Sequence, residues 1–184
     1  MAATESKMVS LGSKAPDFSL SNGLDNTFLN LTDLKGKNGT LILFICNHCP
    51  YVLHIINHFI LFSKKLIENE IGIIAISSND INNYPEDSPA NMLKFSKKYN
   101  FSFPYLFDEK QDVAKKYDAT CTPDFFLYDK NLSLFYRGRY DKSRPNNNEK
   151  LSAQDLDEAV NSLIKNKKFS KTQYPSLGCN IKWK

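Results

Sequence analysis

The chain has 184 residues, of which 41% are apolar and 24% are charged, and its formal net charge is +4. This length predicts one domain with a core large enough to fold without cross-links, and the scattered lysines exclude a nucleic-acid-binding footprint. No segment is long and apolar enough to span a membrane, and four cysteines favour catalytic, redox or metal roles over a disulfide scaffold.

The first part of the chain predicts a hairpin followed by a buried strand. Residues 1–14 lack both an apolar pattern and a signal-peptide core, so we expect a flexible terminus on a cytoplasmic protein. Residues 15–20 and 27–31 indicate the two strands of a hairpin around the turn-rich N-G-L-D-N. The run T-L-I-L-F-I (residues 40–45) is apolar on both faces, which is typical of a central strand.

The middle of the chain predicts two helices around a second buried strand. After Pro50, apolar residues recur at helical spacing to about residue 68. Residues 71–77 indicate the second buried strand. Asp87 is expected to cap a helix that ends near Tyr99, which is the simplest explanation of the acidic stretch S-N-D-I-N-N-Y-P-E-D-S-P.

The last part of the chain predicts a short helix at residues 111–117 and a hairpin made of residues 124–129 and 132–137. An amphipathic helix at residues 152–165 follows. The element order is β–β, β–α–β–α, short helix, β–β–α. It predicts an α/β fold with a mixed central sheet and helices on both faces.

We expect three segments: a flexible N-terminus (1–14), one domain (15–167) and a C-terminal tail (168–184) that packs back on the domain. The tail carries apolar residues in a position where chain ends usually fray. Trp183 is expected to anchor it in an apolar groove.

The motif I-C-N-H-C-P-Y carries the clearest chemistry. Cys46 and Cys49 stand three residues apart after a buried strand and just before a helix, where α/β folds place reactive groups. A helix N-terminus stabilises a thiolate, and a protonated His48 would stabilise it further. In this context C-x-x-C predicts a redox pair.

Zinc binding is the alternative chemistry for the same residues. Its ligands would be the four cysteines or the histidines His48, His54 and His58. The chain has no second C-x-x-C, which disfavours a structural zinc site. His54 and His58, four apart on one helix face, are expected to be solvated or core-edge side chains.

A second signal is the stretch A-T-C-T-P-D-F-F, where Pro123 directly precedes a predicted strand. Its position after two βα units suggests a cis Thr122–Pro123 bond, although only about 5–6% of such bonds in folded proteins are cis.

These motifs together resemble a known family. C-x-x-C after a buried strand and Thr-Pro before a later strand are similar to the thioredoxin fold. The opening A-P-D-F-S-L, the motif F-I-C-N-H-C-P-Y-V and the ending G-C-N-I-K-W-K resemble peroxiredoxin-like (AhpC/TSA, TlpA-like) redoxins, which carry an N-terminal hairpin extension. The resemblance implies that Cys46 is the nucleophile and Cys49 the resolving cysteine. It also implies that His48 tunes the first step and that Thr122 and Pro123 orient the substrate.

The sequence leaves open which cysteine attacks. Pro50 favours Cys49 as the helix-capping thiolate, as in peroxiredoxins, where the peroxide-attacking cysteine is often followed by proline. Against a peroxidase, the arginine that peroxiredoxins keep near their thiolate is absent around residues 121–122. Arg137, Arg139 and Arg144 are expected at a solvated strand end.

We therefore predict a thiol–disulfide oxidoreductase without bound cofactor, in which Cys46 attacks and Cys49 resolves. Its partners would be protein or small-molecule disulfides and an external dithiol, with no nucleic acid or membrane. A thiol peroxidase that uses Cys49 and peroxide is the first alternative, and a non-catalytic binding or redox-sensing module is the second. Cys121 and Cys179 are candidates for additional redox thiols, and a small buried hydrophobe is the other interpretation of Cys121.

Overall fold

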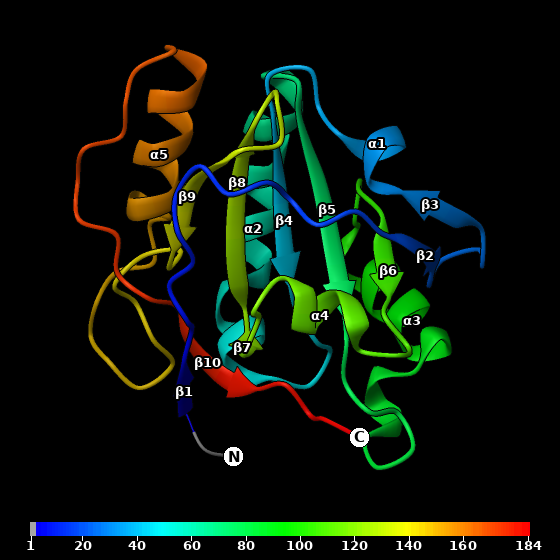
Figure 1. Ribbon diagram of the computed structural model, residues 1–184. Coiled ribbons are helices and arrows are strands. Elements are labelled where there is room, and N and C mark those ends of the chain that lie inside the picture. The colour runs from blue at the N-terminus through cyan, green and yellow to red at the C-terminus, as the bar shows by residue number, and fades with distance from the viewer. Residues whose placement is uncertain (1–2) are drawn as a thin grey trace.

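The computed structural model describes residues 3–184 and contains two sheets (Figure 1). The large, seven-stranded sheet has the order β3-β2-β6-β5-β4-β8-β9. Its strands are β2 (Ser19–Asn22), β3 (Phe28–Asn30), β4 (Gly39–Phe44), β5 (Ile71–Ser77), β6 (Tyr105–Phe107), β8 (Asp124–Asp129) and β9 (Leu134–Gly138). The small sheet has the order β1-β10-β7, with β1 (Ala3–Glu5), β7 (Cys121–Thr122) and β10 (Leu177–Asn180).

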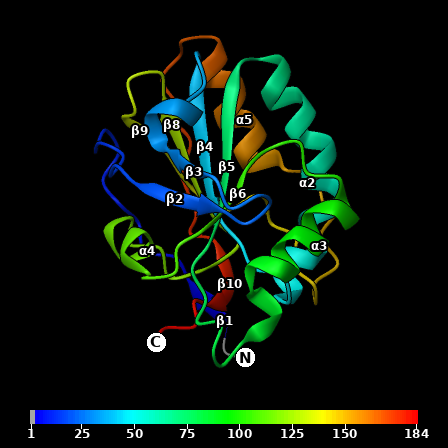
Figure 2. The same cartoon turned by 90° about the vertical axis from the view of Figure 1, so that its right-hand side faces the viewer.

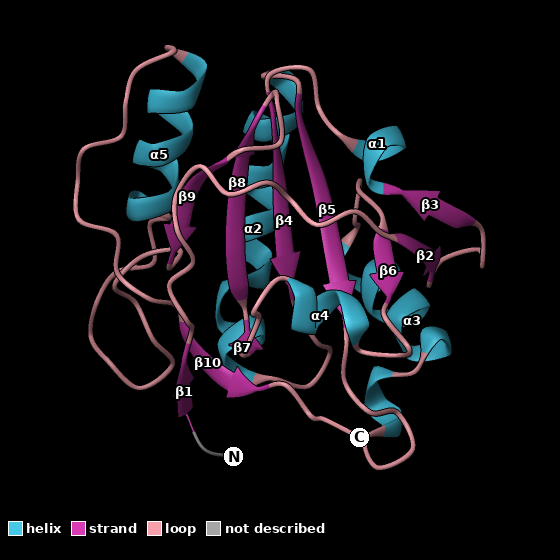
Figure 3. Cartoon of the chain, viewed as in Figure 1, coloured by secondary structure: helices cyan, strands magenta, loops and turns pink. Residues whose placement is uncertain are grey.

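Helices cover both faces of the large sheet, which confirms the predicted α/β class (Figures 2 and 3). They are α1 (Leu31–Leu34), α2 (Pro50–Glu68), α3 (Pro89–Tyr99), α4 (Asp112–Lys116) and α5 (Gln154–Ile164), with a 3₁₀ turn at Pro85–Asp87. Apolar residues of α2, α3 and α5 share one core with one side of the sheet. Those of α1 and α4 belong to a second core on the other side. No helix of residues 3–184 has the length and apolar character needed to cross a membrane.

β4 is the central strand, and all six of its residues are buried. It pairs in parallel with β5 and antiparallel with β8. Side chains alternate along a strand, so Leu41 and Leu43 enter the core on the α2 side, whereas Ile42 and Phe44 enter the core on the α4 side. Because β4 and β5 are parallel, both end at one edge of the sheet, and this edge carries the candidate site.

Most long elements confirm the predicted boundaries to within about two residues. The N-terminal hairpin, the central strand, α2, β5 and the β8–β9 hairpin all form. The structure also contains the short helix α1, which the sequence pattern does not predict. It also contains four short strands that the sequence pattern does not predict: β1, β6, β7 and β10.

The chain ends pair with each other and with the site. β10 lies between β1 and β7, with Cys179 opposite Thr122 in the register, and in Figure 1 it crosses the end of the large sheet. Residues 3–5 therefore form a strand where a flexible terminus was expected. The sequence could not show this, because the strand that pairs with β1 lies more than 170 residues away. The division into terminus, domain and tail itself stays a prediction.

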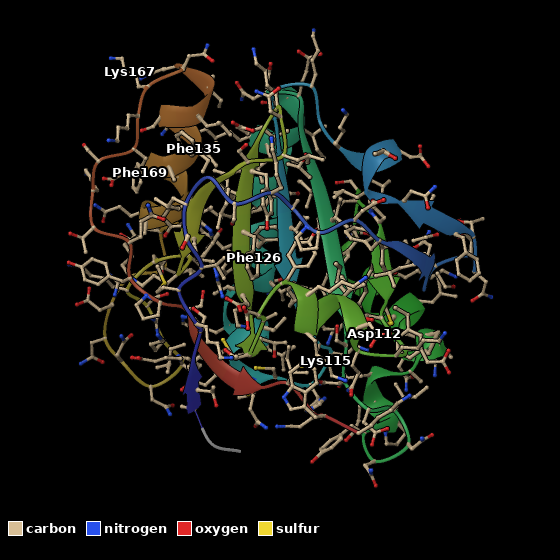
Figure 4. The ribbon with its side chains drawn as sticks, viewed as in Figure 1. Asp112, Lys115, Phe126, Phe135, Lys167 and Phe169 are labelled. Atoms are coloured by element: carbon tan, nitrogen blue, oxygen red, sulfur yellow. The ribbon has the colours of Figure 1, made fainter. Side chains whose placement is uncertain are left out.

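The expected anchoring role of Trp183 is wrong. Trp183 is 43% exposed, and the Lys115 ammonium group, which extends from α4, lies over its ring at 5.9 Å from the ring centre (Figure 4). The side chain of Ile181 is buried instead, and the Ile181 N–H donates to the Thr120 carbonyl at 3.0 Å. The side-chain amides of Asn79 and Gln111 also bind the backbone of Lys182 and Lys184. Backbone pairing, the buried Ile181 and these two amides therefore hold the end of the chain.

Candidate active site

The C-N-H-C motif lies between the end of β4 and the start of α2. Cys49 is the N-cap residue of α2, in an extended conformation, and Pro50 is the first helical residue. Proline disfavours the helical conformation in the residue before it, which is why the helix begins here, as predicted. The Cys49 sulfur thus lies at the end of the helix whose free N–H groups stabilise negative charge. Cys46 and Cys49 are 1% and 0% exposed.

Thr122 contacts both sulfurs from the opposite side of the site. The Thr122–Pro123 bond is cis, which confirms the suggestion from the sequence. Thr122 Oγ1 lies 3.3 Å from Cys46 Sγ, and Cys49 Sγ donates to the Thr122 carbonyl oxygen at 3.1 Å. The structure therefore brings together the two cysteines and the Thr-Pro segment that the sequence singled out.

The two remaining cysteines differ in their relation to the pair. Cys179, on β10, lies beside Cys49, with a distance of 2.8 Å between their sulfurs. Cys121 is fully buried, and its sulfur faces the Pro123 carbonyl oxygen at 3.9 Å. Burial raises the pKa of the Cys121 thiol, which therefore stays protonated. This environment agrees with the interpretation of Cys121 as a small buried hydrophobe.

Asp87 places a fully buried carboxylate in the site. Its Oδ1 accepts the backbone N–H of Asn47 at 2.7 Å, and its Oδ2 accepts the Asn79 side-chain amide at 2.7 Å. His48 Nδ1 lies 2.9 Å from Oδ2. Contact with this carboxylate raises the pKa of His48, against the opposing effect of partial burial. The Tyr84 ring stacks on the imidazole at 5.9 Å with an interplanar angle of 5°.

The expectation that Asp87 caps a helix is therefore wrong. The N-cap residue of α3 is Ser88, and Asp87 turns inward to the C-N-H-C loop instead. The sequence carried one signal for this role. The S-N-D-I-N-N-Y-P-E-D stretch follows β5, and β5 ends at the same sheet edge as β4. Asn79 and Tyr84 come from the same stretch.

The two thiols of the pair titrate as one coupled system. The hydrogen bond from Cys46, with further ones from Cys179 and from the backbone of Val52, lowers the pKa of Cys49 to about 5 against the effect of burial. The hydrogen bond to Cys49, burial and the charge of Asp87 raise the pKa of Cys46. The pair is therefore expected to hold one negative charge near neutral pH, with Cys49 the more acidic of the two thiols.

The structure does not bring the four cysteines, or the three histidines, together as one set of metal ligands. Within residues 3–184, one group of three or more potential ligands has all its donor atoms within 4.8 Å of one another: Cys46, His48 and Asp87. His54 contacts the Ser143 hydroxyl at 3.0 Å and His58 contacts the Tyr140 hydroxyl at 2.7 Å. These contacts agree with the expectation of core-edge histidines.

The arginines all bind away from the cysteines, and the expected solvated strand end is wrong for Arg137. Arg137 is fully buried, pairs with Asp124 and lies 3.9 Å from the centre of the Phe126 ring. Arg139 pairs with Asp155. Arg144 donates to the backbone carbonyl groups of residues 141 and 143. These are the three arginines of the sequence, and none contacts either sulfur of the pair.

Comparison with known proteins gives a family and several relatives. Residues 11–137 match the model of the AhpC/TSA family. The thiol-disulfide oxidoreductase ResA of Geobacillus thermodenitrificans is 30% identical over 132 residues, which cover 70% of this chain and 68% of ResA. Curated relatives of the same name from Geobacillus kaustophilus and Bacillus species are 26–28% identical.

Two solved structures match nearly the whole chain. An uncharacterized conserved protein from Geobacillus kaustophilus is 44% identical, with a TM-score of 0.98 and coverage of 100% of this chain and 97% of that chain. A hypothetical protein from Sinorhizobium meliloti 1021 is 39% identical, with a TM-score of 0.95 and coverage of 98% of both chains. The thioredoxin domain of a thiol-disulfide oxidoreductase from Bacteroides vulgatus is only 17% identical and shares the fold, with a TM-score of 0.64 and coverage of 85% and 99%.

Proposed function

The chain belongs to the AhpC/TSA family, and on that premise we propose that it is a thiol–disulfide oxidoreductase whose redox pair is Cys46 and Cys49. The name of its ResA relatives supports an oxidoreductase role. The observation that carries the proposal for this pair is the double contact of Thr122, whose side chain and carbonyl each meet one of the two sulfurs. Two sulfurs held by one residue at a helix N-terminus are arranged for disulfide exchange.

In the proposed reaction, Cys46 attacks one sulfur of a substrate disulfide and the other substrate sulfur leaves as a thiolate. Cys49 then attacks Cys46, which forms the Cys46–Cys49 disulfide and releases the second substrate thiol. An external dithiol restores the reduced pair, and no bound cofactor is required. Cys46 is assigned the first attack because Cys49 Sγ already contacts both the Thr122 carbonyl and Cys179 Sγ, which suits a resolving thiol, whereas Cys46 Sγ contacts the Thr122 hydroxyl alone among these groups.

Before Cys46 can attack, its proton must be transferred. Cys49 accepts it in this proposal and, as a thiol, donates to the Thr122 carbonyl, while the Thr122 hydroxyl can donate to the Cys46 thiolate. A separate proton stays on His48 beside Asp87, and this imidazolium–carboxylate pair stabilises the negative charge as it moves from Cys49 to Cys46. Cys49 thus has a hydrogen-bond partner in both protonation states.

Thiol peroxidase activity is the second candidate function, and the lowered pKa of Cys49 favours it. A thiolate at a helix N-terminus is the species that attacks peroxide. Without an arginine at either sulfur, however, no guanidinium is available to bind the peroxide and the developing negative charge. Disulfide exchange needs no such group, so we place it first.

Parallel assays separate the two functions. The wild type, Cys46→Ser and Cys49→Ser proteins are each tested for reduction of a protein disulfide and for consumption of hydrogen peroxide. We expect Cys46→Ser to abolish disulfide reduction, whereas Cys121→Ser, as the matched control, retains it. Rapid peroxide consumption that depends on Cys49 alone, without disulfide reduction, would establish the second function instead.

A further inference from the structure

Cys49 has a second sulfur neighbour besides Cys46. Cys179 Sγ lies 2.8 Å from Cys49 Sγ, and Cys179 is 3% exposed. A disulfide has an S–S bond of about 2.05 Å, so a small approach of these two sulfurs would bring them to bonding distance. Cys179 lies 130 residues further along the sequence, and β10, the strand that carries it, brings it beside Cys49.

Strand pairing and one glycine hold β10 close to the site. Cys179 pairs with Thr122, the residue that contacts both sulfurs of the pair. A Cβ atom on Gly178 would lie 2.0 Å from the Thr122 carbonyl oxygen, so only glycine permits this separation. On its other edge β10 pairs with β1. The thiol is thus held in place by its backbone on both sides.

We propose that Cys179 is a third redox cysteine, which takes over the disulfide from the Cys46–Cys49 pair and forms a second disulfide, Cys49–Cys179. The inference rests on the proposed function, because the first disulfide is the product of that reaction. Among residues 3–184, by contrast, no sulfur is in hydrogen-bond contact with Cys121, whose own sulfur faces the Pro123 carbonyl oxygen. The tail is therefore part of the site and supplies one of its reacting groups.

The exchange is balanced within the protein. The Cys179 thiolate attacks Cys49 Sγ, the S–S bond to Cys46 breaks, the bond between Cys49 and Cys179 forms, and Cys46 leaves as a thiolate. The proton lost by Cys179 is taken up by Cys46. One disulfide replaces another, so no electrons enter or leave the protein. Burial first, and then the hydrogen bond to Cys49 and its charge, raise the pKa of Cys179 to about 12 in the reduced protein. The two effects of Cys49 vanish once its sulfur is in a disulfide.

The second disulfide would join two distant parts of the chain. Cys49 is the N-cap residue of α2 and Cys179 lies on β10, so the new bond would tie β10 covalently to the start of α2. An external dithiol that reduces the Cys49–Cys179 bond would release this link.

Disulfide mapping tests the proposal directly. The full-length protein is oxidised with oxidised glutathione, quenched in acid, alkylated with N-ethylmaleimide and digested with trypsin. Cleavage after lysine leaves Cys46 and Cys49 together in the peptide 38–64, Cys179 in the peptide 172–182 and Cys121 in the peptide 117–130. The Cys46–Cys49 disulfide is therefore internal to one peptide, whereas the Cys49–Cys179 disulfide joins two.

We expect the 38–64/172–182 cross-link in the oxidised wild-type monomer, its enrichment in Cys46→Ser, and its loss in both Cys179→Ser and Cys179→Ala. Cys121→Ser should keep the wild-type pattern. An internal Cys46–Cys49 disulfide in the wild type, with no 38–64/172–182 cross-link in either the wild type or Cys46→Ser, would overturn the role of Cys179 and leave the proposed function intact. Absence of the internal disulfide and of disulfide reduction in the wild type would instead refute the proposed function.

Discussion

At the scale of single residues, the site depends on a carboxylate that enters it from outside the motif. Asp87 is fully buried and is met by a backbone N–H, a side-chain amide and an imidazole, a set of partners that keeps a buried charge stable. It links the C-N-H-C loop to the segment after β5. In this position it controls the charge of His48 and raises the pKa of Cys46.

Replacing Asp87 with asparagine should lower the pKa of His48, because the carboxylate is the main cause that raises it. In the wild type the imidazolium is therefore retained to a higher pH and is lost as the pH rises through this raised pKa. Disulfide reduction at neutral pH should fall by about 10²-fold in the variant, because loss of the imidazolium that stabilises the moving charge outweighs the lower pKa that Cys46 gains. NMR titration of the His48 ring measures the shift, with His58 as an internal reference. An unchanged His48 midpoint would contradict this role for Asp87.

The lowered pKa of Cys49 predicts one thiolate in the reduced protein at neutral pH. Its ultraviolet absorbance should be present at neutral pH and disappear as the pH falls through about 5, because the thiolate takes up a proton there. The signal should be absent in Cys49→Ser and preserved in Cys121→Ser. In Cys46→Ala the midpoint should rise, since the hydrogen bond from Cys46 is the largest stabilising effect. A low-pH transition that survives in Cys49→Ser would assign the thiolate to another residue.

At the scale of elements, short strands that pair over long distances hold the reactive groups together. β7 has two residues and β10 has four, yet together they place Thr122 and Cys179 beside the pair. Their sequences show no strand pattern, because two to four residues are too few for an alternation to be recognised. By contrast α2 and β5 are long and carry their own apolar pattern, which is why their positions could be predicted.

Gly178→Ala tests the contact between β10 and β7. The added methyl group cannot fit against the Thr122 carbonyl, so β10 must shift away from the site. We expect a loss of about 1–3 kcal/mol in the free energy of unfolding and loss of the Cys49–Cys179 cross-link. Ser170→Ala, an exposed change in the same tail, is the control. Wild-type stability in both variants would show that the close contact between Gly178 and the Thr122 carbonyl is not required for β10 to pair with β7.

The buried ion pair of Arg137 and Asp124 joins β8 and β9 directly after the cis Thr122–Pro123 bond. Arg137→Leu should cost about 3–5 kcal/mol, because it leaves the buried Asp124 carboxylate without its partner. The double variant Arg137→Leu/Asp124→Leu should recover most of that loss. Urea denaturation measures both. Equal stability of the single and double variants would mean that the charge on Asp124 is compensated by other groups.

At the scale of the whole molecule, the fold class and most residues of the candidate site could be predicted from the sequence. The order of elements was sufficient for the α/β class, and the motifs identified Cys46, His48, Cys49, Thr122 and Pro123. Asp87 was missed because an acidic residue before a helix has the local pattern of a cap. The position of Cys179 beside Cys49 could not be predicted either. It results from β10 crossing the end of the large sheet, which is a property of the assembled fold (Figure 1).

The most direct test of the account is to identify the cysteine that first bonds to a substrate. Cys49→Ser, incubated with a disulfide-linked peptide, should accumulate a mixed disulfide, because the cysteine that resolves it is absent. Mass spectrometry of the alkylated digest should locate the adduct on Cys46, and Cys46→Ser should form none. An adduct on Cys49 of Cys46→Ser, with no adduct on Cys46 of Cys49→Ser, would contradict the assignment and make Cys49 the attacking residue.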